Sequence, residues 1–321
     1  MKKLKARKEL DFNRGWKFLR GDVINSHKEE YLSDHFWREL DLPHDWSIEG
    51  PFRKDNASTM RGGYLPTGIG WYRKTFALDK SDEQKQFFVD FDGIFGISDV
   101  YVNGRHCGYN PNTFQGFQYD ITRHLYFGDK LNVMAVRVDN SVQPACRYYS
   151  GCGICRDVRL IICGRPHIAQ WGIFVRPENV NPRKRTAQVH IETEIIDELP
   201  EGRQITVSHT VLFNGKTVTD FVQKIDLAGN KPQKHSCTIP LTDAKLWDTK
   251  SPHLYKLYTG IKSGNTLIDD KITTFGVRKI EFTHDKGFLL NDRQLKLKGV
   301  CIHHDNGCLG SAAYKRADER K

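Results

Sequence analysis

Two histidines and an aspartate stand side by side near the end of the 321-residue sequence, directly after a short apolar run. His303, His304 and Asp305 follow Val300 to Ile302, so these polar side chains come where a buried strand would end. Imidazoles and carboxylates can hydrogen-bond a polar ligand, and both are also metal ligands. The trio lacks a further metal ligand at suitable spacing, so the pattern favours hydrogen bonding to a ligand over metal binding.

A second group of candidate residues lies between positions 146 and 155. Cys152 and Cys155 have the spacing of half a zinc site, but no second pair of cysteines or histidines follows them as a structural zinc requires. Buried, reduced thiols are therefore the expected state of this pair. Arg147 lies in the loop before them, where its guanidinium can pair with a carboxylate or stack on Tyr148 or Tyr149.

Strands are expected to position both groups. Alternating apolar and polar residues at 87–91, 131–138 and 158–163 predict strands, and the run at 99–104 ends in Asn103-Gly104, which suits a tight hairpin turn. No long amphipathic helix interrupts these runs. Residues 1–165 are therefore predicted to form one antiparallel β-sandwich.

A new alternation begins at Ala187 and predicts a second module. The runs 187–195 and 205–211 are typical of short strands, so residues 166–276 are predicted to form an immunoglobulin-like sandwich without its disulfide. Residues 277–321 contain a hairpin-like stretch at 288–292, a predicted strand at 295–302 and a helix-compatible tail from Ala312. A TIM barrel takes about 250 residues, so this third part is expected to be a truncated barrel start, either poorly ordered or docked onto the sandwiches.

Composition limits the partners. Lys and Arg give a net charge of +10, but they are scattered among 39 acidic residues, so no nucleic acid is expected. No window is apolar enough for a membrane span, and the basic start has no apolar run behind it, so it is no signal peptide as it stands. Cytoplasmic and periplasmic locations both stay open. The glycine-rich stretch 61–70 lacks the ending of a phosphate loop, and no cofactor is expected.

Several sequence strings resemble the N-terminal part of glycoside hydrolase family 2, the β-galactosidase and β-glucuronidase type. Each string is short, but their order and spacing along nearly the whole chain carry the resemblance. They are Phe12-Asn-Arg-Gly-Trp16, Leu42-Pro-His-Asp-Trp46, Gly70-Trp-Tyr-Arg-Lys-Thr-Phe76, Val100-Tyr-Val-Asn-Gly104, Gly153-Ile-Cys-Arg-Asp-Val158, Pro252-His-Leu-Tyr255, Phe275-Gly-Val-Arg278 and Lys298-Gly-Val-Cys-Ile-His-His-Asp305.

The resemblance implies a fold and a set of sugar contacts. The fold is all-β: a jelly-roll sugar-binding-type domain, an immunoglobulin-like sandwich and the first strand of an incomplete TIM barrel. His303, His304 and Asp305 fall where the family contacts its sugar, and Arg147 stands where the better-known relatives carry an aspartate that binds the sugar. The partner implied is a β-glycoside, with no metal. Trp16, Trp37, Trp46 and Trp71 are expected in cores or interfaces.

The implied reaction is retaining hydrolysis of O-glycosyl bonds, with a β-galactoside as the first choice of substrate. Such enzymes use two carboxylates about 5 to 5.5 Å apart, and in the family both are glutamates deeper in the barrel than residue 321. The chain alone is therefore expected to be inactive. The alternative is a non-catalytic β-sandwich that binds carbohydrate.

Overall fold

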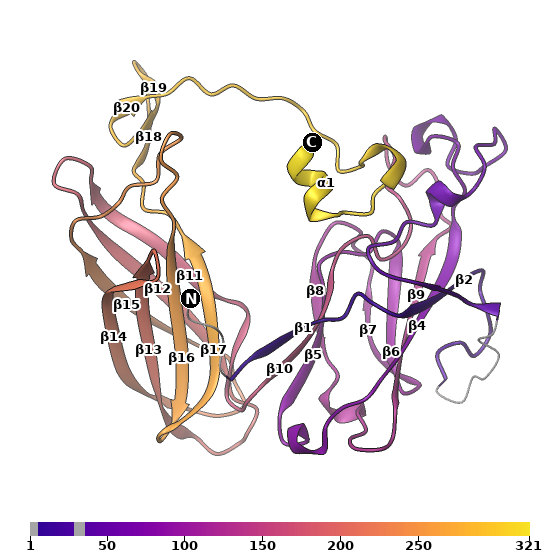
Figure 1. Ribbon diagram of the computed structural model, residues 1–321, viewed down its shortest axis with the longest axis horizontal. Helices are drawn as coiled ribbons and strands as arrows, with labels where there is room; N and C mark the ends of the chain where they lie inside the picture. Colours follow the sequence, from indigo (N-terminus) through magenta and orange to yellow (C-terminus); the bar gives the residue numbers. More distant parts are fainter. Residues whose placement is uncertain (1–5, 29–35) are drawn as a thin grey trace. The chain divides into compact units, whose positions relative to one another are not determined.

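The computed structural model describes residues 6–28 and 36–321 (Figure 1). Strands make up most of its regular structure, as predicted, and α1 (Lys315–Arg320) is the α-helix among the described residues. The chain divides into two compact units. The N-terminal unit comprises residues 9–162 and 302–321, and the middle unit comprises the described residues up to Lys8 together with 163–301. The predicted domain boundaries at 165 and 276 stay predictions.

The N-terminal unit is a sandwich of two antiparallel sheets. One sheet has six strands in the order β3-β2-β4-β9-β6-β7, and the other has four in the order β1-β10-β5-β8. The strands are β1 (Lys8–Asp11), β2 (Trp16–Arg20), β3 (Arg38–Leu40), β4 (Gly68–Phe76), β5 (Gln86–Phe91), β6 (Ile97–Val102), β7 (Arg105–Asn110), β8 (Phe117–Asp120), β9 (Asn132–Asn140) and β10 (Val158–Cys163). Short 3-10 turns lie at Ser47–Glu49, Met60–Gly62, Lys80–Asp82, Thr122–His124 and Gly307–Leu309.

Inward-facing side chains from both sheets fill the core of this unit. On β6 the residues alternate as predicted, with Ser98, Val100 and Val102 buried. Asn103 and Gly104 both have positive φ, which is the geometry of the predicted two-residue hairpin turn. The four tryptophans predicted to be buried are at most 5% exposed, and they are Trp16, Trp37, Trp46 and Trp71.

The middle unit is a second sandwich, with a small hairpin sheet beyond its two main sheets (Figure 1). Its core gathers the alternating residues of the predicted strands, such as Val189, Ile191 and Val211. The three-stranded sheet contains β11 (His167–Asn181), β12 (Thr186–Ile196) and β15 (Gln233–Leu241); the four-stranded sheet contains β13 (Arg203–Phe213), β14 (Lys216–Leu227), β16 (Tyr255–Ser263) and β17 (Thr266–Phe275); the hairpin sheet contains β18 (Ile280–Thr283), β19 (Gly287–Leu290) and β20 (Arg293–Gln294).

A buried ion pair joins the start of the chain to this sandwich. The Arg7 guanidinium donates to both carboxylate oxygens of Asp269, at 2.9 and 2.7 Å, and to the Ile168 carbonyl at 2.6 Å. The two charged side chains are 4% and 0% exposed. Ile168 N also donates to Asp269 at 2.7 Å, so both oxygens of this buried carboxylate accept hydrogen bonds from the protein.

The strand predicted at 295–302 does not form. Apart from one hydrogen bond from Leu295 N to the Phe288 carbonyl of β19 at 3.0 Å, these residues pair with no described strand, and Leu297, Val300 and Ile302 are 64%, 85% and 64% exposed. A parallel barrel strand is held by neighbours on both sides and covered by helices, and the described residues supply neither, so the apolar pattern alone does not make a strand here. Cys301 is exposed like its neighbours Val300 and Ile302, whereas Leu309 is half-buried. Among the described residues, no helix is long and apolar enough to cross a membrane.

Candidate functional site

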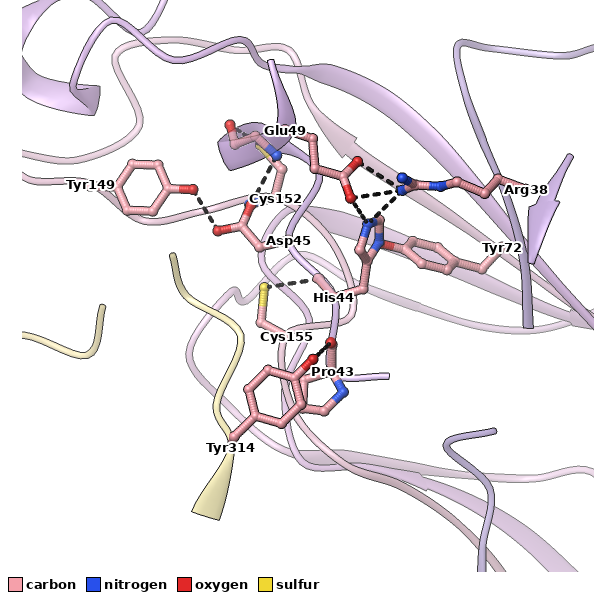
Figure 2. Close-up of polar contacts among 11 residues, drawn as sticks. Arg38, Pro43, His44, Asp45, Glu49, Tyr72, Tyr149, Cys152, Cys155 and Tyr314 are labelled. Carbon is pink, nitrogen blue, oxygen red and sulfur yellow. Dashed lines mark hydrogen bonds and ion pairs between the residues drawn. The ribbon is translucent and has the colours of Figure 1, made fainter. Parts of the chain in front are cut away.

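The segment 302–314 lies on the N-terminal sandwich, beside the loop that joins β9 to β10. Ala313 N donates to the Cys155 carbonyl at 2.8 Å. The Tyr314 hydroxyl donates to the Pro43 carbonyl at 3.0 Å, as Figure 2 shows. The His304 ring lies 3.3 Å from the Ser150 carbonyl through Nε2. Of the two states expected for this segment, poorly ordered or docked, the structure therefore has the docked one.

Both candidate histidines meet the same aromatic ring from that loop. The Tyr148 ring centroid lies 5.0 Å from His303, in an edge-to-face arrangement, and 5.8 Å from His304. His304 also packs on Phe95 at 4.8 Å and lies 6.1 Å from Phe114. In a strand, neighbouring residues face opposite sides, but no strand forms at this position, so both imidazoles lie beside Tyr148.

A cavity of about 820 Å³ opens next to this cluster. His303 and His304 line it from the C-terminal segment, Phe95 and Arg156 from the sandwich, and Lys315 from α1. Burial lowers the pKa of His304, and the Ser150 carbonyl partly offsets this. A neutral imidazole can both donate and accept a hydrogen bond, which suits the hydroxyl groups of a polar ligand.

The other two candidate residues are near this cluster but outside the cavity lining. Asp305 is half-buried, and its backbone carbonyl accepts a hydrogen bond from the Lys321 ammonium group. Arg147 is exposed, and no described residue pairs with its guanidinium. The sequence left open a stacking of Arg147 on Tyr148 or Tyr149. In the described part of the chain the Arg147 guanidinium stacks on neither ring. A guanidinium in this state can still bind a carboxylate.

Asp45 is the most densely bonded polar side chain of the region, and the sequence did not single it out. Its carboxylate is buried, with the residue 2% exposed. Oδ1 accepts from Ser47 N and Cys152 N, both at 3.0 Å. Oδ2 accepts from the Tyr149 hydroxyl at 2.5 Å and from Ser311 N and Oγ, both at 2.9 Å. Figure 2 shows the contacts with Tyr149 and Cys152.

A second polar network surrounds the neighbouring His44 (Figure 2). Nδ1 lies 2.8 Å from the Tyr72 hydroxyl, and Nε2 lies 3.1 Å from Glu49 Oε1. Arg38 donates to both oxygens of Glu49 at 2.8 Å. Burial lowers the pKa of His44, while the Glu49 carboxylate works in the opposite direction. The network fixes the turn that carries Asp45, because His44 is held from both ring nitrogens.

The cysteine pair is buried and makes hydrogen bonds. Asn140 Nδ2 lies 2.9 Å from Cys152 Sγ, and Cys155 Sγ lies 3.0 Å from Ser311 Oγ. Burial raises the pKa of Cys152 to about 12 and that of Cys155 well above its ordinary value. Both are therefore neutral thiols at physiological pH, in agreement with the predicted buried state. Within residues 6–28 and 36–321, no cluster of His, Cys, Asp and Glu could hold a metal ion.

Comparison with known proteins assigns a family to both sandwiches. Residues 38–176 match the family model described as glycosyl hydrolase 2 galactose-binding domain-like, and residues 167–278 match the model described as glycosyl hydrolases family 2. Among curated relatives, the Bacteroides ovatus protein named beta-galactosidase BoGH2A is 40% identical over 98% of this chain and 36% of its own length. A putative beta-glucuronidase of Formosa agariphila is 38% identical over 95% of this chain and 28% of its own.

Solved structures agree. A glycosyl hydrolase family 2 member from Bacteroides cellulosilyticus superposes with a TM-score of 0.92 at 36% identity, over 97% of this chain and 40% of that one. A Bacteroides uniformis beta-glucuronidase superposes with a TM-score of 0.87 at 27% identity, over 98% of this chain and 38% of that one. The chain thus spans about a third of the length of the curated relatives cited above and corresponds to their N-terminal portion.

Proposed function

Because the chain belongs to glycoside hydrolase family 2, we propose that it forms the non-catalytic wall of the substrate site in a retaining β-glycosidase. In this proposal His303, His304, Asp305 and Arg147 contact the sugar, while the groups that attack and protonate the glycosidic bond lie in a barrel outside these residues. The observation that carries the proposal is the docking of residues 302–314 on the N-terminal sandwich, which brings His303 and His304 beside Tyr148 and makes both histidines line one cavity.

A β-galactoside is the first choice of substrate, in line with the name of the Bacteroides ovatus relative. A β-glucuronide is the second candidate, and Arg147 is the residue that favours it. Its exposed guanidinium has no partner among the described residues, and a planar guanidinium binds a carboxylate with two parallel hydrogen bonds. A β-mannoside ranks behind both. In the complete enzyme, Arg147→Met should weaken the binding of a β-glucuronide much more than the binding of a β-galactoside.

The 321-residue chain by itself is expected to be inactive. Purified chain is incubated with chromogenic β-galactoside and β-glucuronide, and a mock purification from the same host measures contaminating activity. Turnover no faster than the mock is expected, because protonation of the leaving oxygen and attack on the anomeric carbon both need the missing carboxylates. Robust turnover that survives further purification would refute the division of labour proposed above.

The alternative is a non-catalytic carbohydrate-binding protein. Calorimetric titration of the same chain with galactosides and glucuronides distinguishes it from the enzyme-fragment proposal. The enzyme-fragment proposal expects little affinity, since half of the sugar's contacts are supplied elsewhere. Saturable binding with a micromolar dissociation constant, which corresponds to about −8 kcal/mol, would favour the binding protein.

A further inference from the structure

Three stretches of the N-terminal unit converge on the carboxylate of Asp45. They are the turn 45–47 itself, the end of the β9–β10 loop through Tyr149 and Cys152, and the C-terminal segment through Ser311. Ser311 is 266 positions away along the chain, so this contact is purely tertiary. We infer that Asp45 is a positioning residue of the candidate site, which holds the Tyr148 loop against the His303–His304 segment.

The chemistry of the five donors supports a charged acceptor at this place. Three are backbone N–H groups, which can only donate, and two are hydroxyls that donate to a carboxylate with charge-assisted strength. Burial and the negative charge of Asp45 hold the pKa of Tyr149 well above its usual range, so its hydroxyl keeps the proton that it donates. A buried carboxylate without these donors would carry a large desolvation cost, so the donors and Asp45 stabilise one another.

Two glycines allow the three stretches to approach this closely. A Cβ on Gly151 would lie 1.7 Å from Ser311 Oγ and 2.9 Å from Asp45 Oδ2. A Cβ on Gly310 would lie 2.4 Å from the same Asp45 oxygen. Both glycines have positive φ, at 82° and 57°, which other residues rarely adopt. The absence of a Cβ at Gly151 and Gly310 thus lets the backbone approach Asp45 and Ser311 closely.

The hydrogen bonds to Asp45 hold in place the residues that are proposed to contact the sugar. Tyr149 and Cys152 fix the loop that carries Arg147 and Tyr148, and Ser311 fixes the segment that carries the two histidines. Apart from Asp45, the loop and the segment share hydrogen bonds of the Ser150 carbonyl with His304, of the Cys155 carbonyl with Ala313 and of Cys155 Sγ with Ser311 Oγ. The functional meaning of this arrangement rests on the function proposed above, whereas the arrangement itself can be tested without any sugar.

The test substitutes Asp45→Asn in the 321-residue chain. An amide keeps the shape but places an NH2 group on one side: in place of Oδ1 it would face Ser47 N and Cys152 N, and in place of Oδ2 it would face Ser311 N. Either orientation leaves at least one backbone N–H opposite another donor. The matched control is Asp41→Asn, since Asp41 lies in the same loop, is exposed, and accepts one bond from Gly15 N at 2.8 Å.

Hydrogen exchange followed by mass spectrometry measures how firmly residues 302–314 are docked. The His304 ring signals in NMR measure the titration of this side chain at the candidate site. With Asp45→Asn we expect exchange about tenfold faster in peptides covering 302–314 and 146–152, because the opening free energy falls when their anchor is lost. The pKa of His304, lowered by burial in the wild type, should rise toward its ordinary value. Strands β4 and β9 should keep their protection, and Asp41→Asn should match the wild type.

Unchanged exchange at 302–314 together with an unchanged His304 titration would overturn the inference. So would equal loss of protection in β4 and β9, since Asp45 would then stabilise the whole sandwich and position nothing in particular. If Asp45→Asn fails to fold, Ser311→Ala decides, with Cys155→Ala as its control. Ser311→Ala removes one hydroxyl donor to Asp45 together with the contact of Ser311 Oγ with Cys155 Sγ, and it leaves Asp45 bonded to Tyr149, Ser47, Cys152 and the backbone N–H of residue 311. Cys155→Ala removes only the thiol contact and should loosen 302–314 less. Ser311→Ala must loosen 302–314 selectively. The sugar assays above report on the proposed function separately from these readouts.

Discussion

His209 should make the stability of the middle unit depend on pH. It lies on β13 with its side chain in the core, 1% exposed, and Nδ1 lies 3.1 Å from Thr259 Oγ1 on β16. Burial lowers its pKa from the ordinary value of 6.5 to about 4. Between these two values the unfolded chain binds a proton that the folded unit does not bind. Stability is therefore fully present above pH 6.5 and is lost as the pH falls toward 4.

The size of the loss follows from the difference in pKa. One pKa unit corresponds to about 1.4 kcal/mol, so His209 accounts for about 3 kcal/mol in full and about 2 kcal/mol between pH 7.5 and pH 5. Other histidines contribute as well, so the contribution of His209 is isolated with His209→Leu, which places an apolar side chain in the core position and cannot titrate. Urea unfolding at the two pH values, with the middle-unit transition assigned by hydrogen exchange, measures the difference.

Wild type should lose about 2 kcal/mol more than His209→Leu over this interval. The control is His284→Leu, because the His284 side chain is fully exposed, at 102% of its reference area, and should leave the wild-type pH dependence in place. Equal losses in wild type and His209→Leu would refute the reasoning, since His209 would then titrate alike in the folded and unfolded chains.

Two further predictions concern buried charge and thiol reactivity. Arg7→Met should destabilise the middle unit by about 3 to 5 kcal/mol, because it leaves the Asp269 carboxylate buried without its partner; the charge-neutral pair Arg7→Met with Asp269→Asn should recover most of this in thermal unfolding, and equal stability of both variants would contradict it. Under native conditions at pH 8, iodoacetamide should modify the exposed Cys301 and Cys308 first and spare Cys152, whose pKa burial raises to about 12. Peptide mass spectrometry of the labelled chain checks this order.

The strands were predictable from the sequence because their signal is local. Val100 and Val102 alternate with polar neighbours, and Asn103-Gly104 suits only a tight turn, so a few residues specify the β6–β7 hairpin. The same reasoning failed at 295–302, where Val300 and Ile302 have a strand-like pattern but no partner strand. A pattern gives the preference of a segment, whereas pairing depends on what lies beside it.

The candidate site could be predicted from the sequence only in part, for a related reason. The resemblance pointed to His303 and His304, and the structure brings both beside Tyr148, but their sugar contacts stay predictions. Asp45 was invisible as a positioning residue, because its partners Tyr149 and Ser311 are 104 and 266 residues away. An aspartate beside a tryptophan in the sequence carries no sign of five donors, which only the folded chain brings together.

The split of the N-terminal unit along the chain has a consequence for biosynthesis. Residues 163–301 are translated between the two parts of this unit, so Ser311 leaves the ribosome long after Asp45, Tyr149 and Cys152. At 5 to 20 residues per second the interval is on the order of ten seconds. During that time the sandwich can form its sheets, but Asp45 Oδ2 faces water where Ser311 will later donate. The nascent sandwich can therefore form its sheets before residues 302–314 have been translated and can dock on it.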